Sequence, residues 1–135
     1  MKTSIEKRYP SNQDAVVKAE RLVEKFTRKL DFDEDQRVDV AIAITEAVNN
    51  AVEHGNRLQA DRTVTVRLEW RDSRLVITVR DQGEGFDPDA IDDPLSPENL
   101  TRPDGRGLLI VRSLMDSVEV NPSSEGTEVV MVKKR

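Results

Sequence analysis

The chain has 135 residues, 36% hydrophobic and 35% charged, with a formal net charge of −5. This length and balance fit one globular domain, which we expect to cover residues 1–135. The chain contains no cysteine and a single histidine, which excludes a disulfide framework, a thiol nucleophile and a multi-histidine metal site within one chain. No stretch is long and apolar enough to cross a membrane, and the N-terminus lacks a signal-peptide pattern, so we expect a cytoplasmic protein. The acidic balance argues against direct binding of nucleic acid.

A strand followed by a helix is predicted at the start of the chain. Residues 3–9 favour a short strand, which Pro10 and Ser11 should end. The helix is expected to begin near Ser11 or Asn12 and to end near Leu30. Its apolar residues recur every three or four positions, which is the helical period: Ala15, Ala19, Leu22, Phe26 and Leu30. The acidic segment 31–35 predicts a loop whose carboxylates cap the next helix.

A second helix is predicted over residues 34–54, with Gly55 as its terminating residue. Apolar side chains surround almost its whole circumference, which predicts a largely buried helix. Glu46, Asn50 and Glu53 interrupt them at spacings of four and three residues, so they share one face. A polar helix edge or a contact between subunits would explain this face. So would a metal-and-water site, because an Asn oxygen suits Mg²⁺ and a carboxylate one turn earlier can act as a general base.

A hairpin and a long loop are predicted next. Alternating apolar residues predict strands over 64–70 and 75–79, joined by a turn at 71–73. Residues 86–104 contain four prolines and no clear periodicity, which predicts a long loop. Long loops of this kind often act as lids over a binding site.

The remainder predicts a third helix over 105–115 and a second hairpin, with strands at 117–120 and 127–132. Because hairpins join most of the strands, we expect a mixed, mainly antiparallel sheet. The three helices should cover one face of it. The expected fold class is therefore an α/β (α+β) two-layer sandwich.

Three short segments carry residues that could contact a nucleotide. The segment Asp81-Gln82-Gly83-Glu84-Gly85 follows a strand, where an Asp can accept a hydrogen bond from an exocyclic amine and glycines let backbone approach a flat ring. The segment Gly105-Arg106-Gly107-Leu108 opens a helix, where free N–H groups can bind an anion, although it is neither a Walker A loop nor a Rossmann fingerprint. Thr127 could point its hydroxyl into a pocket. Taken singly, neither glycine segment is diagnostic, because a glycine-containing turn also explains it, and an ordinary hairpin turn is the better explanation of Thr127.

The order and spacing of these segments resemble the GHKL ATPase superfamily, which includes gyrase-type topoisomerases, MutL and the catalytic domains of histidine kinases. The resemblance covers residues 25–132. Glu46 and Asn50 match the N box of the family. Its two glycine boxes and its terminal Gly-Thr element are matched by Asp81, Gly83, Gly85, Gly105, Gly107 and Thr127. This likeness implies the Bergerat-type ATP-binding fold.

The resemblance also implies roles for individual residues. Asn50 would ligate a Mg²⁺ ion bridging the phosphates of ATP, and Asp81 would bind the adenine amino group. The loop 86–104 would be the ATP lid. Glu46 would accept the proton of an attacking hydroxyl. The phosphates would face the main-chain amides of Gly105, Arg106, Gly107 and Leu108.

Within the superfamily, the strand and helix before the N box are similar to those of anti-sigma-factor serine kinases of the RsbW type. This implies a homodimeric protein that binds a sigma factor and phosphorylates a serine or threonine of a STAS-domain antagonist. Two alternatives stay open: a non-catalytic ATP-binding partner-switch module, and a histidine-kinase-like catalytic domain acting in trans. Glu46 favours the kinase over the non-catalytic module. His54, the single histidine, is interpreted as a helix-end residue rather than a phosphoacceptor.

Overall fold

In the computed structural model, which describes residues 3–56, 61–83 and 106–135, five strands form one sheet in the order β1-β2-β3-β5-β4. All four strand pairs are antiparallel. The side chains of residues 54–55 and 106–108 also lie outside the description, as does the predicted lid over 86–104. The strands are β1 (Thr3–Pro10), β2 (Thr63–Arg71), β3 (Arg74–Arg80), β4 (Ser117–Ser123) and β5 (Gly126–Lys134).

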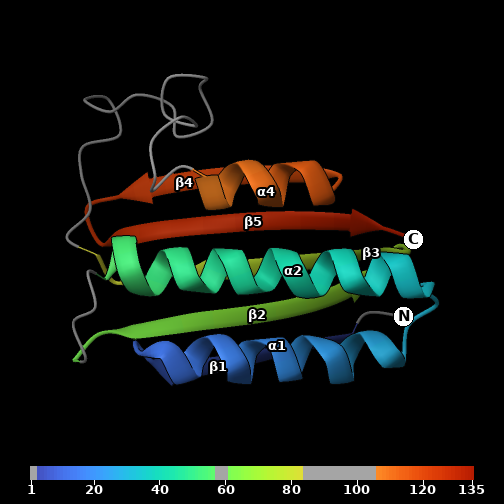
Figure 1. Ribbon diagram of the computed structural model, residues 1–135, viewed down its shortest axis with the longest axis horizontal. Coiled ribbons are helices and arrows are strands. Elements are labelled where there is room, and N and C mark those ends of the chain that lie inside the picture. Colours follow the sequence, from blue (N-terminus) through green and yellow to red (C-terminus); the bar gives the residue numbers. More distant parts are fainter. Residues whose placement is uncertain (1–2, 57–60, 84–105) are drawn as a thin grey trace.

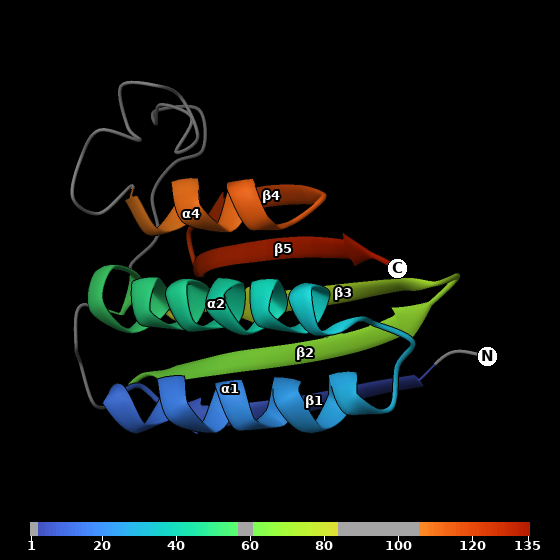
Figure 2. The same ribbon diagram turned by 45° about the vertical axis from the view of Figure 1, so that its right-hand side comes forward.

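The described helices lie together on one face of this sheet, as Figures 1 and 2 show. They are α1 (Gln13–Arg28), α2 (Glu34–Asn50) and α4 (Arg106–Leu114). α2 packs between α1 and α4, and it continues as a one-turn π-helix, η1 (Ala51–Gly55). The predicted two-layer α+β sandwich is confirmed. None of the helices in the described ranges is long and apolar enough to span a bilayer.

The alternating pattern of β2 and β3 explains why the sheet has one buried face. Residues at every second position point toward the helices and are fully buried, and Leu68 lies directly opposite Ile77. Each such aliphatic side chain contributes about 2 kcal/mol through removal of its surface from water. The intervening positions include Arg67 and Arg80, which are exposed on the other face.

The hairpin turns are tighter than the sequence predicts. Asp72 and Ser73 form the β2–β3 turn, with φ angles of 52° and 60°. Two consecutive residues with positive φ define the turn type that matches the twist of a two-residue hairpin. In the second hairpin, β4 extends to Ser123 and includes Pro122. A proline is tolerated there because β4 is an edge strand of the described sheet, with no strand on its outer side to receive an N–H.

The helix α2 begins with a capping box, in which the Asp33 side chain accepts from the Gln36 N–H and the Gln36 side chain accepts from the Asp33 N–H. This confirms the predicted capping role of the acidic loop. The prediction that α2 is buried almost all round is wrong. Val38 is 49% exposed and Ile42 42% exposed, because a helix in a single layer over a sheet keeps its outer face in solvent. The last predicted turn of α2 is π-helical rather than α-helical.

The buried stripe of α1 is also shifted from the predicted one. Ala15 and Ala19 are buried as expected, but the stripe continues through Val23 and Thr27. Leu22 and the other large apolar residues of the predicted stripe pack only partly against the core. Thr27 is accommodated because its hydroxyl donates to the Val23 carbonyl at 2.8 Å.

Candidate nucleotide-binding site

Asp81 is the first residue after β3, and it joins β3 to the start of β5. Its backbone N–H donates to the Thr127 carbonyl at 3.0 Å. Its side-chain Oδ1 accepts from the N–H of Thr127 at 3.0 Å and from the N–H of Gly83 at 2.9 Å. The structure thus brings together Asp81, Gly83 and Thr127, which the sequence places in two separate motifs.

The surroundings of Asp81 fix the orientation of its side chain and shift the pKa of its carboxyl group. The residue is only 6% exposed, and burial raises the pKa of its carboxyl group above the ordinary value of 3.8. The N–H groups of Gly83 and Thr127 and the charge of Arg62 oppose that rise. Both backbone bonds use Oδ1, so Oδ2 is the oxygen that could accept from a ligand. A buried carboxylate held in one direction is suited to a single directed hydrogen bond from an amine.

Gly126 precedes Thr127 in the Gly-Thr element, but the sequence motifs assign a role only to Thr127. Its φ of 140° is one that residues with side chains rarely adopt. A β-carbon at this position would overlap the carbonyl oxygen of Asp81 and would lie 3.2 Å from Asp81 Oδ1. The close approach of β5 to Asp81 therefore requires glycine here. The Gly-Thr pair at the start of a predicted strand is the signal that could have indicated it.

Glu46 and Asn50 lie one turn apart on α2, and both side chains are partly exposed. The C-terminal end of α2 lies at the same end of the sheet as the end of β3 and the start of β5 (Figure 1). The π-helix η1 that follows Asn50 contacts β5. Single π turns of this kind are frequent at functional sites. The N-box residues and the Asp81 segment thus belong to the same end of the molecule.

The second predicted glycine box lies only partly within the description. Arg106, Gly107 and Leu108 form the first turn of α4, whereas Gly105 and Gly85 lie outside the described residues. The first N–H groups of a helix have no partner within the helix, and the helix dipole favours an anion there. The backbone of α4 could therefore bind phosphate, as the sequence predicts.

Asn56 is a second residue that the sequence motifs do not single out. It is fully buried although its side chain is polar. Its Nδ2 donates to Ser11 Oγ and to the Thr63 carbonyl, both at 3.0 Å, and its Oδ1 accepts from the Gln82 N–H at 2.7 Å. Its position directly after the histidine and glycine that end the second predicted helix carries no pattern that would have revealed these contacts.

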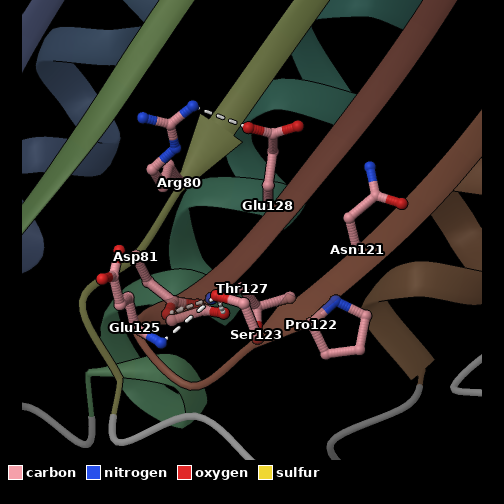
Figure 3. A pocket seen from close by; sticks show the side chains of 9 residues that line it. Arg80, Asp81, Asn121, Pro122, Ser123, Glu125, Thr127 and Glu128 are labelled. Atoms are coloured by element: carbon pink, nitrogen blue, oxygen red, sulfur yellow. Dashed lines mark hydrogen bonds and ion pairs between the residues drawn. The ribbon is translucent and has the colours of Figure 1, made fainter. Parts of the chain in front are cut away.

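A cavity of about 320 Å³ opens beside Asp81 and Thr127 at the end of the sheet (Figure 3). Arg80 and Glu128 face each other across β3 and β5 in this cavity, with an ion pair of 2.7 Å. None of its lining residues comes from α2, so this cavity does not contain the N box. The lining residues are Arg80, Asp81, Asn121, Pro122, Ser123, Glu125, Gly126, Thr127 and Glu128.

The sequence of this chain is similar to a known domain family and to anti-sigma factors and serine-protein kinases. Residues 9–133 match the family model described as histidine kinase-like ATPase domain. An anti-sigma F factor of Clostridium beijerinckii is 33% identical over 117 residues, which cover 83% of this chain and 80% of the relative. A serine-protein kinase RsbW of Halalkalibacterium halodurans is 30% identical over 136 residues, covering 96% of this chain and 82% of the relative.

Solved structures agree on the fold. A structure of the RsbU and RsbW domains of a Mycobacterium tuberculosis protein matches with a TM-score of 0.73 at 17% identity, covering 98% of this chain and 32% of that chain. The catalytic domain of histidine kinase ThkA matches with a TM-score of 0.61 at 15% identity, covering 96% of this chain and 95% of that chain. The predicted likeness to GHKL ATPases is confirmed, and the chain belongs to the family of histidine kinase-like ATPase domains.

Proposed function

We propose that this chain is an ATP-dependent serine/threonine protein kinase that acts as an anti-sigma factor. The observation that carries the proposal is its similarity to an anti-sigma F factor and to a serine-protein kinase RsbW over most of their lengths. The geometry supports it, because α2 carries a carboxylate and an amide one turn apart and ends at the same end of the sheet as β3, which Asp81 directly follows (Figure 1).

The binding of ATP would use three parts of the site. Asp81 would accept a hydrogen bond from the exocyclic amine of adenine, and the first turn of α4 would bind phosphate through its N–H groups. Asn50 would supply a hard oxygen ligand to Mg²⁺. Among the described residues no group of three or more histidine, cysteine or acidic side chains could hold a metal ion. In the proposal, phosphate oxygens of ATP would bind the ion together with Asn50.

Phosphoryl transfer would proceed by positioning and by neutralisation of charge. The hydroxyl oxygen of the substrate would bond to the γ-phosphorus while the bond from that phosphorus to ADP breaks. Glu46 would accept the hydroxyl proton, as a general base on the accessible face of α2. Mg²⁺ would neutralise charge on the phosphates, and the helix N-terminus would add to this effect.

The proposed partners are a sigma factor and a STAS-domain antagonist that carries the phosphorylated serine or threonine. We place the chain in the cytoplasm, because a sigma factor acts on RNA polymerase there. A homodimer is proposed from the resemblance to RsbW-type kinases. Direct contact with nucleic acid is not part of the proposal, since the chain carries a net charge of −5.

Incubation with γ-labelled ATP, Mg²⁺ and candidate STAS-domain proteins tests the proposal. We expect label on the antagonist that survives acid, because phosphoserine and phosphothreonine are acid-stable whereas phosphohistidine is not. Acid-labile label would instead support a histidine-kinase-like domain. Tight binding of a sigma factor with no labelled antagonist would support the non-catalytic switch. Either of these two results would contradict the kinase proposal.

A further inference from the structure

Three hydrogen bonds among Asn56, Thr63 and Gln82 form a closed ring. Asn56 Nδ2 donates to the Thr63 carbonyl at 3.0 Å. The Thr63 N–H donates to Gln82 Oε1 at 2.7 Å. The Gln82 N–H completes the ring by donating to Asn56 Oδ1 at 2.7 Å. The three residues follow η1, begin β2 and follow β3, so the ring joins segments that are distant along the chain.

The ring holds the Asp81 segment on the side away from β5. Gln82 lies between Asp81 and Gly83, and its N–H is bonded to Asn56. On the other side, both the N–H and the Oδ1 of Asp81 are bonded to Thr127. The site segment is therefore held from two directions, by β5 and by the ring.

The same ring connects this segment to the helix that carries the N box. The Asn56 N–H donates to the Ala51 carbonyl at 2.7 Å, a bond that spans five residues and closes the π turn. That turn begins directly after Asn50. One residue thus bonds through its backbone to the end of α2 and through its side chain to the Asp81 segment.

Asparagine is well suited to this position. The ring needs one acceptor and one donor on the same planar group, and Asn56 Nδ2 also donates to Ser11 Oγ. An aspartate could not donate, and an apolar residue would leave the partly buried carbonyl of Thr63 and N–H of Gln82 without this partner. The side chain of Gln82 is exposed, so it can be truncated without opening a cavity.

We propose that the Asn56–Thr63–Gln82 ring is a positioning device that sets the preference of the site for adenine. It fixes the Asp81 carboxylate relative to the helix bearing Asn50, and it rests on the ATP binding proposed above. Adenine offers an amine to the carboxylate, whereas guanine offers a carbonyl oxygen at the same ring position. A firmly held carboxylate accepts a hydrogen bond from the adenine amine and repels the guanine carbonyl oxygen. A loosely held carboxylate discriminates less between the two bases.

Calorimetric affinities for ATP, with GTP measured by competition, test the ring in the full chain. We expect Gln82→Ala and Asn56→Ala to weaken ATP binding about tenfold, the effect of one lost directed hydrogen bond, with a much smaller change for GTP. Ser11→Ala is the matched control, because it removes the side-chain bond between Asn56 and Ser11, which is not part of the ring. It should lower the urea midpoint of unfolding and leave the ATP-to-GTP ratio unchanged.

An unchanged ratio in folded Gln82→Ala overturns the positioning role, as does an equal loss of ATP and GTP affinity. If Asn56→Ala does not fold, the exposed Gln82→Ala variant decides alone. The wild-type chain separates this inference from the proposed function. If the wild-type protein binds no ATP, the proposed function and the role of the ring are both contradicted. If the wild type binds ATP and the ring variants bind ATP and GTP with the same affinities as the wild type, only the role of the ring is contradicted.

Discussion

The backbone of Gly126 lies so close to Asp81 that a β-carbon there would overlap the Asp81 carbonyl oxygen. We therefore expect Gly126→Ala to displace the Asp81 segment from β5. The positive φ of Gly126 adds backbone strain of about 1–3 kcal/mol for a residue with a side chain. Urea unfolding should show this loss of stability, and calorimetry should show ATP affinity reduced at least about tenfold. Ser124→Ala, in the adjoining exposed turn, is the control and should change neither quantity.

Asp81→Asn separates stability from nucleotide recognition. The amide keeps an oxygen for the N–H groups of Gly83 and Thr127 but presents an NH₂ group where the second carboxylate oxygen lies. We expect ATP binding to be lost because two donors would then face each other. Stability at neutral pH should be equal or higher, since burial disfavours the ionised carboxylate. Asp72→Asn, in the exposed hairpin turn, controls for the loss of one negative charge. Retained ATP affinity in Asp81→Asn would remove Asp81 from the adenine site.

The raised pKa of Asp81 predicts a dependence on pH with a definite sign. The folded state binds this proton more tightly than the unfolded state, so the contribution of Asp81 favours folding in acid and is lost as pH rises through the folded pKa. Binding of ATP has the opposite trend, because a protonated Oδ2 no longer accepts from an amine. Calorimetry at decreasing pH should show ATP affinity starting to fall above the ordinary carboxyl pKa of 3.8. A profile that falls only below that value would contradict the assignment.

Glu46→Gln should separate phosphoryl transfer from ATP binding. The amide matches the shape of the carboxylate but cannot accept a proton, so transfer to the antagonist should fall by about 10²-fold or more. ATP affinity should stay close to that of the wild type. Glu53→Gln removes a carboxylate two turns further along and should leave transfer unchanged. Parallel losses of binding and transfer in Glu46→Gln would show that Glu46 supports the fold instead.

Asn50→Ala tests the proposed ligand of Mg²⁺. We expect the variant to lose the part of its ATP affinity that depends on Mg²⁺, because alanine offers no oxygen to the ion. Titrations with Mg²⁺ and with a chelator should then give similar dissociation constants for Asn50→Ala and different ones for the wild type. Asn49→Ala, one residue earlier on a different side of the helix, is the matched control. An Mg²⁺ effect that persists in Asn50→Ala would contradict the assignment.

Local periodicity predicts most of the fold, because burial on one face imposes a repeat of two in strands and of 3.6 in helices. The strands β2 and β3 follow this rule closely. The outer face of α2 does not, since Val38 and Ile42 are apolar but exposed. The π turn after Asn50 has no distinctive composition, so the sequence predicts ordinary helix there.

The candidate site is predictable where the chain order of motifs carries the information. The structure brings Asp81 and Thr127 together, as the order of the motifs predicts, although the roles of these residues stay predictions. The ring around Asn56 is not predictable in this way. Its members lie 7, 19 and 26 residues apart, and their bonds depend on how η1, β2 and β3 meet in space.

The strand order has a consequence for the way the molecule opens. Among the described strands, β1 and β4 form the edges of the sheet, and β3 lies at its centre beside β5. Amide hydrogens exchange first where a structure frays, and edge strands fray more readily than inner ones. The amides of Asp81 and Thr127 sit where the two inner strands meet, and they should exchange late. A molecule that has transiently released β1 could therefore still keep the proposed adenine site at Asp81 intact.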